Sequence, residues 1–204
     1  ADIKAVTALR GFAMTAITAL TAQNTLGVHG VMGVPIDFIR QQIAVVLDDL
    51  GADAIKTGML HAVPVIEAVC DELAARARGI PLVADPVMVA KGGHPLLAPD
   101  AVETLKARLL PLATVITPNL PEAEVLTGRP IRTLAEMREA ATALRALGVP
   151  AVLLKGGHLD GPECTDILHG EACTRAFSVR RIGTRRTHGT GCTLASAIAA
   201  RRAQ

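Results

Sequence analysis

The chain contains no tryptophan and no tyrosine, and three phenylalanines are its only aromatic side chains. Proteins that bind single-stranded nucleic acid stack bases on aromatic rings, so this scarcity argues against nucleic acid as a partner. No apolar run reaches the roughly 18 residues that a membrane span needs, and Asp2 and Lys4 interrupt the stretch where a signal peptide would be apolar. The four cysteines form no C-x-x-C pair. We therefore expect a cytoplasmic protein with reduced thiols and no membrane partner.

The sequence also lacks the motif G-x-x-x-x-G-K-S/T, which excludes a P-loop kinase. Its charge is uneven, because the net charge is only +2 while residues 175–204 contain seven arginines and no acidic residue. Such a segment attracts anions. A phosphorylated ligand, duplex DNA and a merely solvated face are all compatible with it.

Apolar segments and helical patterns alternate along the chain without a linker or repeat. The periodicity predicts helices over residues 1–10, 35–50, 62–78, 100–110, 133–147 and 189–200, strands over 13–22, 54–56, 82–85, 114–116 and 151–154, and hairpins over 24–34 and 166–182. Capping boxes are expected at Asp100 with Glu103 and at Thr133 with Glu136. The alternation predicts a parallel sheet covered by helices on both faces.

Polar residues follow the ends of five predicted strands, where ligands bind in parallel α/β sheets. These segments are Gln23-Asn24, Lys56-Thr57-Gly58-Met59, Asp85-Pro86, Thr117-Pro118-Asn119 and Lys155-Gly156-Gly157-His158. Later, Gly189-Thr-Gly-Cys192 begins the last predicted helix and offers backbone N–H groups and a positive helix end to a phosphate. A tight packing turn explains this short motif equally well.

Six segments in this order resemble a known family along the whole chain. They are Leu20-Thr-Ala-Gln-Asn-Thr25, Lys56-Thr-Gly-Met-Leu60, Asp85-Pro-Val-Met-Val-Ala-Lys91, Thr117-Pro-Asn-Leu-Pro-Glu-Ala123, Leu154-Lys-Gly-Gly-His-Leu159 and Thr187-His-Gly-Thr-Gly-Cys-Thr193. Together they resemble the bacterial hydroxymethylpyrimidine/phosphomethylpyrimidine kinases of thiamine biosynthesis, in the ribokinase-like superfamily. The resemblance implies an α/β three-layer sandwich with a mostly parallel central sheet, the cofactors ATP and Mg2+, a small pyrimidine substrate, and a homodimer.

The resemblance assigns Cys192 the place of the catalytic base beside the substrate hydroxymethyl group. A thiol at a helix N-terminus amid arginines is expected to have a lowered pKa. Gly189, Thr190 and Gly191 would supply backbone donors to the transferring phosphoryl group. The structural alternative is that Cys192 is an inert core residue.

Three residues are expected to contact the pyrimidine. The Gln23 carboxamide would pair with the ring nitrogen and the exocyclic amine, as a carboxamide does with adenine. Met59 would cover the ring and Val87 would line its other side. An ordinary turn residue and a core methionine are the alternatives for Gln23 and Met59.

The nucleotide and metal sites follow from the same resemblance. Lys155, Asn119 and Thr187 are expected to bind the nucleotide, Lys155 by placing its charge at the phosphates. Asp85 and Glu122 would hold Mg2+. Asn119 and Glu122 also have the spacing of a helix cap, and Asp85 could simply cap the turn at Pro86. The tetrapeptide of Lys155 recurs at residues 91–94, in a loop that could fold over the substrate, although chance also explains the recurrence.

Family members carry a first strand and a glycine-rich loop before the segment that matches Ala1–Lys4, and further helices after the position of Gln204. We therefore expect residues 1–204 to form a single ribokinase-like kinase domain without those parts. The alternatives are a pyridoxal or pyridoxine kinase, because its substrate carries a hydroxymethyl group on a similar ring, and a non-catalytic pyrimidine- or nucleotide-binding fragment. Gln23 favours the pyrimidine.

Overall fold

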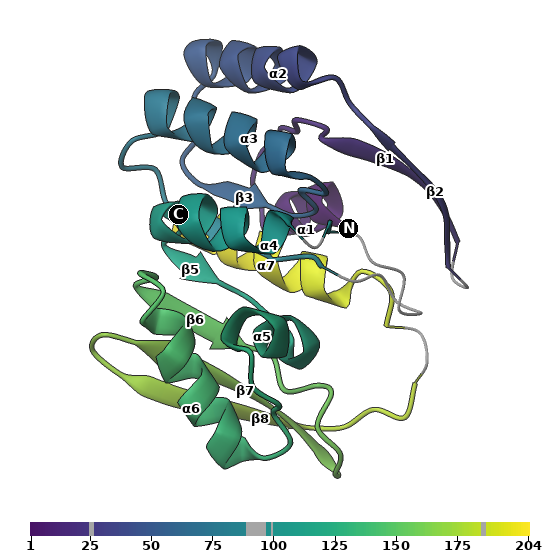
Figure 1. Cartoon of the computed structure of the whole chain (residues 1–204), viewed down its shortest axis with the longest axis vertical. Coiled ribbons are helices and arrows are strands. Elements are labelled where there is room, and N and C mark those ends of the chain that lie inside the picture. The colour runs from purple at the N-terminus through teal and green to yellow at the C-terminus, as the bar shows by residue number, and fades with distance from the viewer. Residues whose placement is uncertain (25–26, 89–96, 99, 185–186) are drawn as a thin grey trace.

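The central sheet of the computed structural model contains six strands, which lie side by side in the order in which they occur along the chain (Figure 1). They are β3 (Ile55–Thr57), β4 (Leu82–Ala84), β5 (Val115–Ile116), β6 (Ala151–Leu154), β7 (Glu163–Gly170) and β8 (Thr174–Arg180). The first four are parallel to one another, and β7 and β8 continue the sheet as an antiparallel hairpin. The structure describes residues 1–24, 27–88, 97–98, 100–184 and 187–204.

Helices cover both faces of this sheet. One face carries α3 (Val63–Arg76), α4 (Ala101–Thr104) with the π-helix Leu105–Leu109 and the 3-10 turn Leu110–Leu112, α5 (Leu120–Thr127) and α6 (Leu134–Arg145), with α2 (Ile36–Asp49) packed outside α3. The opposite face carries α7 (Thr190–Arg202), with α1 (Asp2–Ala8) beside it. Within the described ranges, no helix is long and apolar enough to span a membrane.

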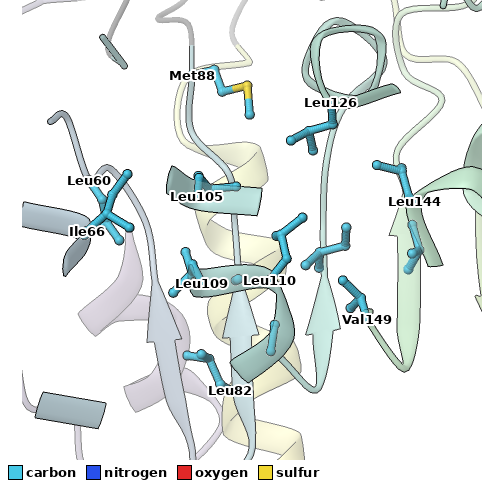
Figure 2. Packing of buried hydrophobic residues seen from close by; sticks show 14 of the residues in the cluster. Leu60, Ile66, Leu82, Met88, Leu105, Leu109, Leu110, Leu126, Leu144 and Val149 are labelled. Carbon is cyan, nitrogen blue, oxygen red and sulfur yellow. The ribbon is translucent and has the colours of Figure 1, made fainter. Parts of the chain in front are cut away.

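The two-residue period of the strands divides the core between the two faces. In β4, Leu82 and Ala84 belong to the large cluster on the side of α3 to α6, part of which Figure 2 shows, whereas Val83 packs against α7. In β6, Val152 and Leu154 join the large cluster and Leu153 faces α7. Each buried valine or leucine among them contributes roughly 1.5–3 kcal/mol through burial.

The expected three-layer arrangement, the alternation of strands and helices and the hairpin over 166–182 are confirmed. The hairpin expected within 24–34 is wrong, because residues 28–33 form one strand that pairs with the preceding segment. The predicted strand 13–22 is wrong over its first half, since only β1 (Ala19–Gln23) pairs, with β2 (Val28–Gly33). At Ile17 the Gln42 side chain takes the place of a strand partner, because it accepts from the backbone N–H at 2.9 Å and donates to the carbonyl at 3.0 Å.

Two helix predictions also change. The box at Thr133 and Glu136 forms, but Asp100 has helical dihedral angles, φ −70° and ψ −20°, and makes no capping bond with the residues that the structure describes. The sequence predicts only a possible cap at Asn119 and not α5 as an element. Its eight residues are too few for the periodicity to identify.

Candidate active site at the carboxyl ends of the strands

Three polar side chains from successive strand ends meet below the N-terminus of α7. Asp85 follows β4, Thr117 follows β5 and Lys155 follows β6. Asp85 is 3% exposed, and its Oδ1 accepts from Thr117 Oγ1 at 2.9 Å and from Lys155 Nζ at 3.1 Å. The sheet hydrogen bonding continues past the strands to place them, because the N–H of Asp85 donates to Thr57 O and that of Thr117 to Ala84 O, each at 3.0 Å.

The first turn of α7 lies directly against this group. Gly189, the N-cap, has φ +77°, a left-handed conformation that favours glycine. A Cβ added to Gly191 would lie 3.2 Å from Lys155 Nζ and 4.0 Å from Asp85 Oδ2, so glycine permits the close approach. By position, the N–H groups of Gly191 and Cys192 have no carbonyl acceptor within the helix. They and Lys155 make this corner attractive to a phosphate.

The Cys192 thiol is half-buried at this corner, and its pKa is raised rather than lowered. Burial is the main cause, the negative charges of Asp85 and Asp2 add to it, and the positive charges of Lys56 and Lys155 oppose it. The expectation of a lowered pKa is therefore wrong. It counted neighbouring arginines and the helix end, and it had no means of counting burial.

Glu122 closes the N-terminus of α5 and also faces the polar group. Its backbone N–H donates to Asn119 Oδ1 at 2.9 Å while its Oε2 accepts from the Asn119 N–H at 2.8 Å, so the cap that the spacing allowed is real. The side chain is 4% exposed, and burial raises its pKa to about 7. The charge of Asp85 raises this pKa further, whereas Lys155 and the N–H of Asn119 lower it.

Asp85 and Glu122 fit a magnesium site by their chemistry. Mg2+ is commonly held by one or two carboxylates together with phosphate oxygens and water. The two carboxylates are buried and repel each other electrostatically, and a divalent cation would relieve that repulsion. Across the described part of the chain, no cluster of three histidine, cysteine or acidic side chains could hold a metal by itself.

Of the other expected residues, Val87 hydrogen-bonds to Asp85, whereas Thr187 and Met59 accept hydrogen bonds from residues outside this group. Val87 is half-buried and donates its N–H to Asp85 O at 2.9 Å, and Thr187 accepts from Thr190 Oγ1 at 3.0 Å. Met59 is half-buried after β3, and its carbonyl accepts from Thr18 Oγ1 at 2.8 Å. Gln23 is exposed at the end of β1, beside a β-bulge. The loop 91–94 lies outside the described residues.

The sequence did not indicate Asp2 or Ser196 as site residues, and it gave Lys56 no role in the site. The sequence indicates Lys56 only as part of a polar strand end, whereas in the structure its ammonium acts electrostatically on Cys192. Asp2 and Ser196 join it, because Asp2 Oδ1 lies 3.5 Å from Lys56 Nζ and accepts from Ser196 Oγ at 2.7 Å. The spacing of Cys192 and Ser196, one helical turn apart, was the only available signal.

Comparison with known proteins places this geometry in a family. The family model described as phosphomethylpyrimidine kinase matches residues 1–204. The chain is 50% identical to the thiamine biosynthesis bifunctional protein ThiED of Geobacter sulfurreducens, matching over its own full length and 41% of that protein. It is 46% identical to the hydroxymethylpyrimidine/phosphomethylpyrimidine kinase of Salmonella typhimurium, covering 99% of this chain and 76% of the relative.

A solved structure agrees with the sequence comparisons. The ADP complex of Bacillus subtilis pyridoxal kinase superposes with a TM-score of 0.90 at 37% identity, covering 99% of this chain and 77% of that one. The ribokinase-like fold class expected from the six motifs is therefore confirmed. This chain belongs to the phosphomethylpyrimidine kinase family.

Proposed function

We propose that the chain transfers the γ-phosphoryl group of ATP to the hydroxymethyl oxygen of 4-amino-5-hydroxymethyl-2-methylpyrimidine, and then a second phosphoryl group to the resulting monophosphate. The observation that carries the proposal is the meeting of Cys192, Gly191, Lys155 and Asp85 at one corner of the sheet. This corner supplies a proton acceptor, backbone donors and a cation within one small volume. Such positioning and charge stabilisation are the main contributions to phosphoryl transfer.

Different residues of the protein are proposed to bind the transferring phosphoryl group, the nucleotide and Mg2+. The N–H groups of Gly191 and Cys192 and the positive end of α7 stabilise the charge on the transferring phosphoryl oxygens. Lys155 adds a positive charge that Asp85 holds in place at 3.1 Å. Asn119 and Thr187 are proposed to contact the nucleotide beside it. Asp85 and Glu122 would hold Mg2+, which when bound neutralises charge on the phosphates.

Cys192 is proposed to take the proton of the hydroxymethyl group. As the oxygen forms its bond to the γ-phosphorus, the bond from that phosphorus to the β–γ bridging oxygen breaks, ADP leaves, and the proton passes to the Cys192 sulfur. Because burial raises the pKa of this thiol, the thiolate is the minor form at neutral pH but a strong base.

The pyrimidine is proposed to lie between Met59 and Val87, with Gln23 on its polar edge. A pyridoxal kinase is the second candidate, favoured by the structural agreement with the B. subtilis enzyme.

We place the protein in the cytoplasm as a homodimer. The exposed apolar side chains of the β1–β2 hairpin, Leu20, Val31 and Met32, support a protein contact there.

ADP release with each substrate tests the function. We expect a higher kcat/KM with the hydroxymethylpyrimidine than with pyridoxal; the reverse order would make pyridoxal the substrate.

Cys192→Ala and Gly191→Ala should each lower kcat about 100-fold, the second because its Cβ meets Lys155. Gly183→Ala is the matched control, since a Cβ there meets no described residue within 4 Å. Undiminished turnover by Cys192→Ala removes that residue from the mechanism.

A further inference from the structure

Lys56 occupies a confined place between the sheet and α7. It lies in the middle of β3, its side chain is 11% exposed, and its neighbours Ile55 and Thr57 belong to the opposite face by the strand period. A Cβ on Gly58 would approach Lys56 Nζ to 2.8 Å, so the ammonium occupies space that the glycine leaves. Lysine is rarely so enclosed without a partner.

Asp2 holds that ammonium, and Ser196, far away in sequence, holds Asp2. Asp2, on α1, lies 3.5 Å from Lys56 Nζ, and the same oxygen accepts from Ser196 Oγ at 2.7 Å. Ser196 is buried on α7 one turn after Cys192. Strand β3 and helices α1 and α7 therefore meet at one carboxylate oxygen beside the thiol.

We propose that Lys56 is the positioning cation of Cys192, held by Asp2 and Ser196 so that it stabilises the thiolate before proton transfer. The inference rests on the proposed function, because it gives the thiolate its role. Lys56 stays protonated throughout, and the only proton that moves is the one that passes from the hydroxymethyl group to sulfur.

The other charges around Cys192 leave Lys56 as the effective one. Among the residues that the structure describes, four charged groups act on the thiol, namely Lys56, Lys155, Asp85 and Asp2. Lys155 and Asp85 form an ion pair at 3.1 Å, so their opposite charges largely cancel at the sulfur. The Asp2 side chain is 49% exposed, and solvent screens its charge more than that of Lys56.

Alkylation of Cys192 by iodoacetamide, followed by peptide mass spectrometry across pH, tests the proposal without any substrate. Only the thiolate reacts, so the rate reports its population. In Lys56→Met we expect the pH profile to move up by about one unit and the rate at pH 7 to fall about tenfold. Lys56→Arg should restore most of the rate. Lys4→Met, an exposed lysine on α1, is the matched control and should leave it unchanged.

A second variant, Asp2→Asn, is expected to change the alkylation rate of Cys192 in the opposite direction. Asp2→Asn removes the negative charge, while the asparagine side-chain oxygen can still accept from Ser196 and Lys56 and keep the lysine in place. We therefore expect Cys192 to alkylate a few-fold faster. A purely structural role for the ion pair would not raise reactivity. An unchanged profile in folded Lys56→Met, or no increase in Asp2→Asn, overturns the proposal.

The same variants separate this inference from the proposed function. In ADP release, Lys56→Met should lower kcat while leaving the KM for the pyrimidine unchanged. If the wild type releases no ADP but its alkylation depends on Lys56 as expected, the proposed function fails and the assignment of Lys56 stands. If turnover is normal in Lys56→Met and alkylation does not change, Lys56 is not the partner of Cys192.

Discussion

Glu122 combines a structural and a chemical role in one buried carboxyl group. It completes the capping box of α5 through Asn119, and its side chain faces Asp85 and Lys155. Burial opposes its ionisation, and the backbone donors of Asn119 and Met88 and the charge of Lys155 do not fully compensate, so its pKa rises from 4.5 to about 7. At neutral pH this carboxyl group is partly protonated. A bound cation would lower its pKa and so favour the carboxylate.

This shift predicts how stability depends on pH in EDTA. Between about pH 4.5 and 7 the unfolded chain releases the Glu122 proton while the folded protein keeps it. The free energy of unfolding should therefore fall as the pH rises through this window and level off above about 7, a loss of at most about 3 kcal/mol. Urea unfolding at several pH values measures it.

Glu122→Gln is the control for that experiment, because glutamine keeps the capping geometry and does not titrate. The variant should lose the downward trend in this window. The same slope in both proteins would show that another group causes the pH dependence.

At the level of single residues, the sequence predicted where Cys192, Lys155 and Asp85 lie but not how they behave. Position follows from the rule that the ends of parallel strands meet at one edge. The pKa of Cys192 follows from burial by distant segments, which no local pattern contains. The link from Asp2 to Ser196 spans 194 positions and requires the packing of α1 on α7.

At the level of elements, helix starts allow a comparison of two sequence signals of the same kind. Thr133 has extended dihedral angles and accepts from the Glu136 N–H at 3.2 Å, whereas Asp100 is already helical. A side chain can cap only from the extended conformation that precedes a helix. The dihedral angles of Asp100 make the difference, and the pattern S/T/D-x-x-E does not encode them.

Alanine substitutions at the two positions should therefore differ. Thr133→Ala should lower the free energy of unfolding by about 1 kcal/mol, because it leaves the Glu136 N–H without its acceptor. Asp100→Ala, the matched control, should change stability by less than about 0.5 kcal/mol. Chemical denaturation measures both, and equal losses would contradict the structural difference.

Strands were predicted more accurately at the centre of the sheet than at the β1–β2 hairpin. Central strands are apolar on both faces, so their sequences are distinctive. Residues 13–18 have a similar apolar pattern, yet they satisfy their backbone partly through the Gln42 side chain. Tertiary contacts of this kind decide the boundary, and a window of sequence does not show them.

At the level of the whole molecule, the two faces of the sheet differ in the size of the side chains that pack between the sheet and its helices. The side of α3 to α6 holds most of the buried leucine and isoleucine, whereas α7 meets the sheet through small residues, among them Ala195 and Ala199. These alanines pack on Val83, Val115 and Leu153. Small side chains keep the axis of α7 close to the sheet, and this closeness brings Gly191 to Lys155.

Ala195→Leu should therefore damage activity more than stability. The larger side chain has no space against Val83 and Leu153, so overpacking should cost about 1–3 kcal/mol of unfolding free energy. The displaced helix would carry the backbone donors of Gly191 and Cys192 away from Lys155, and an error of about 1 Å there can lower the rate about 100-fold. ADP release and thermal unfolding of the same preparation separate the two effects. Ala135→Leu makes the same change on the exposed side of α6 and should affect neither. Normal ADP release by folded Ala195→Leu would show that the position of α7 does not set the geometry of the site.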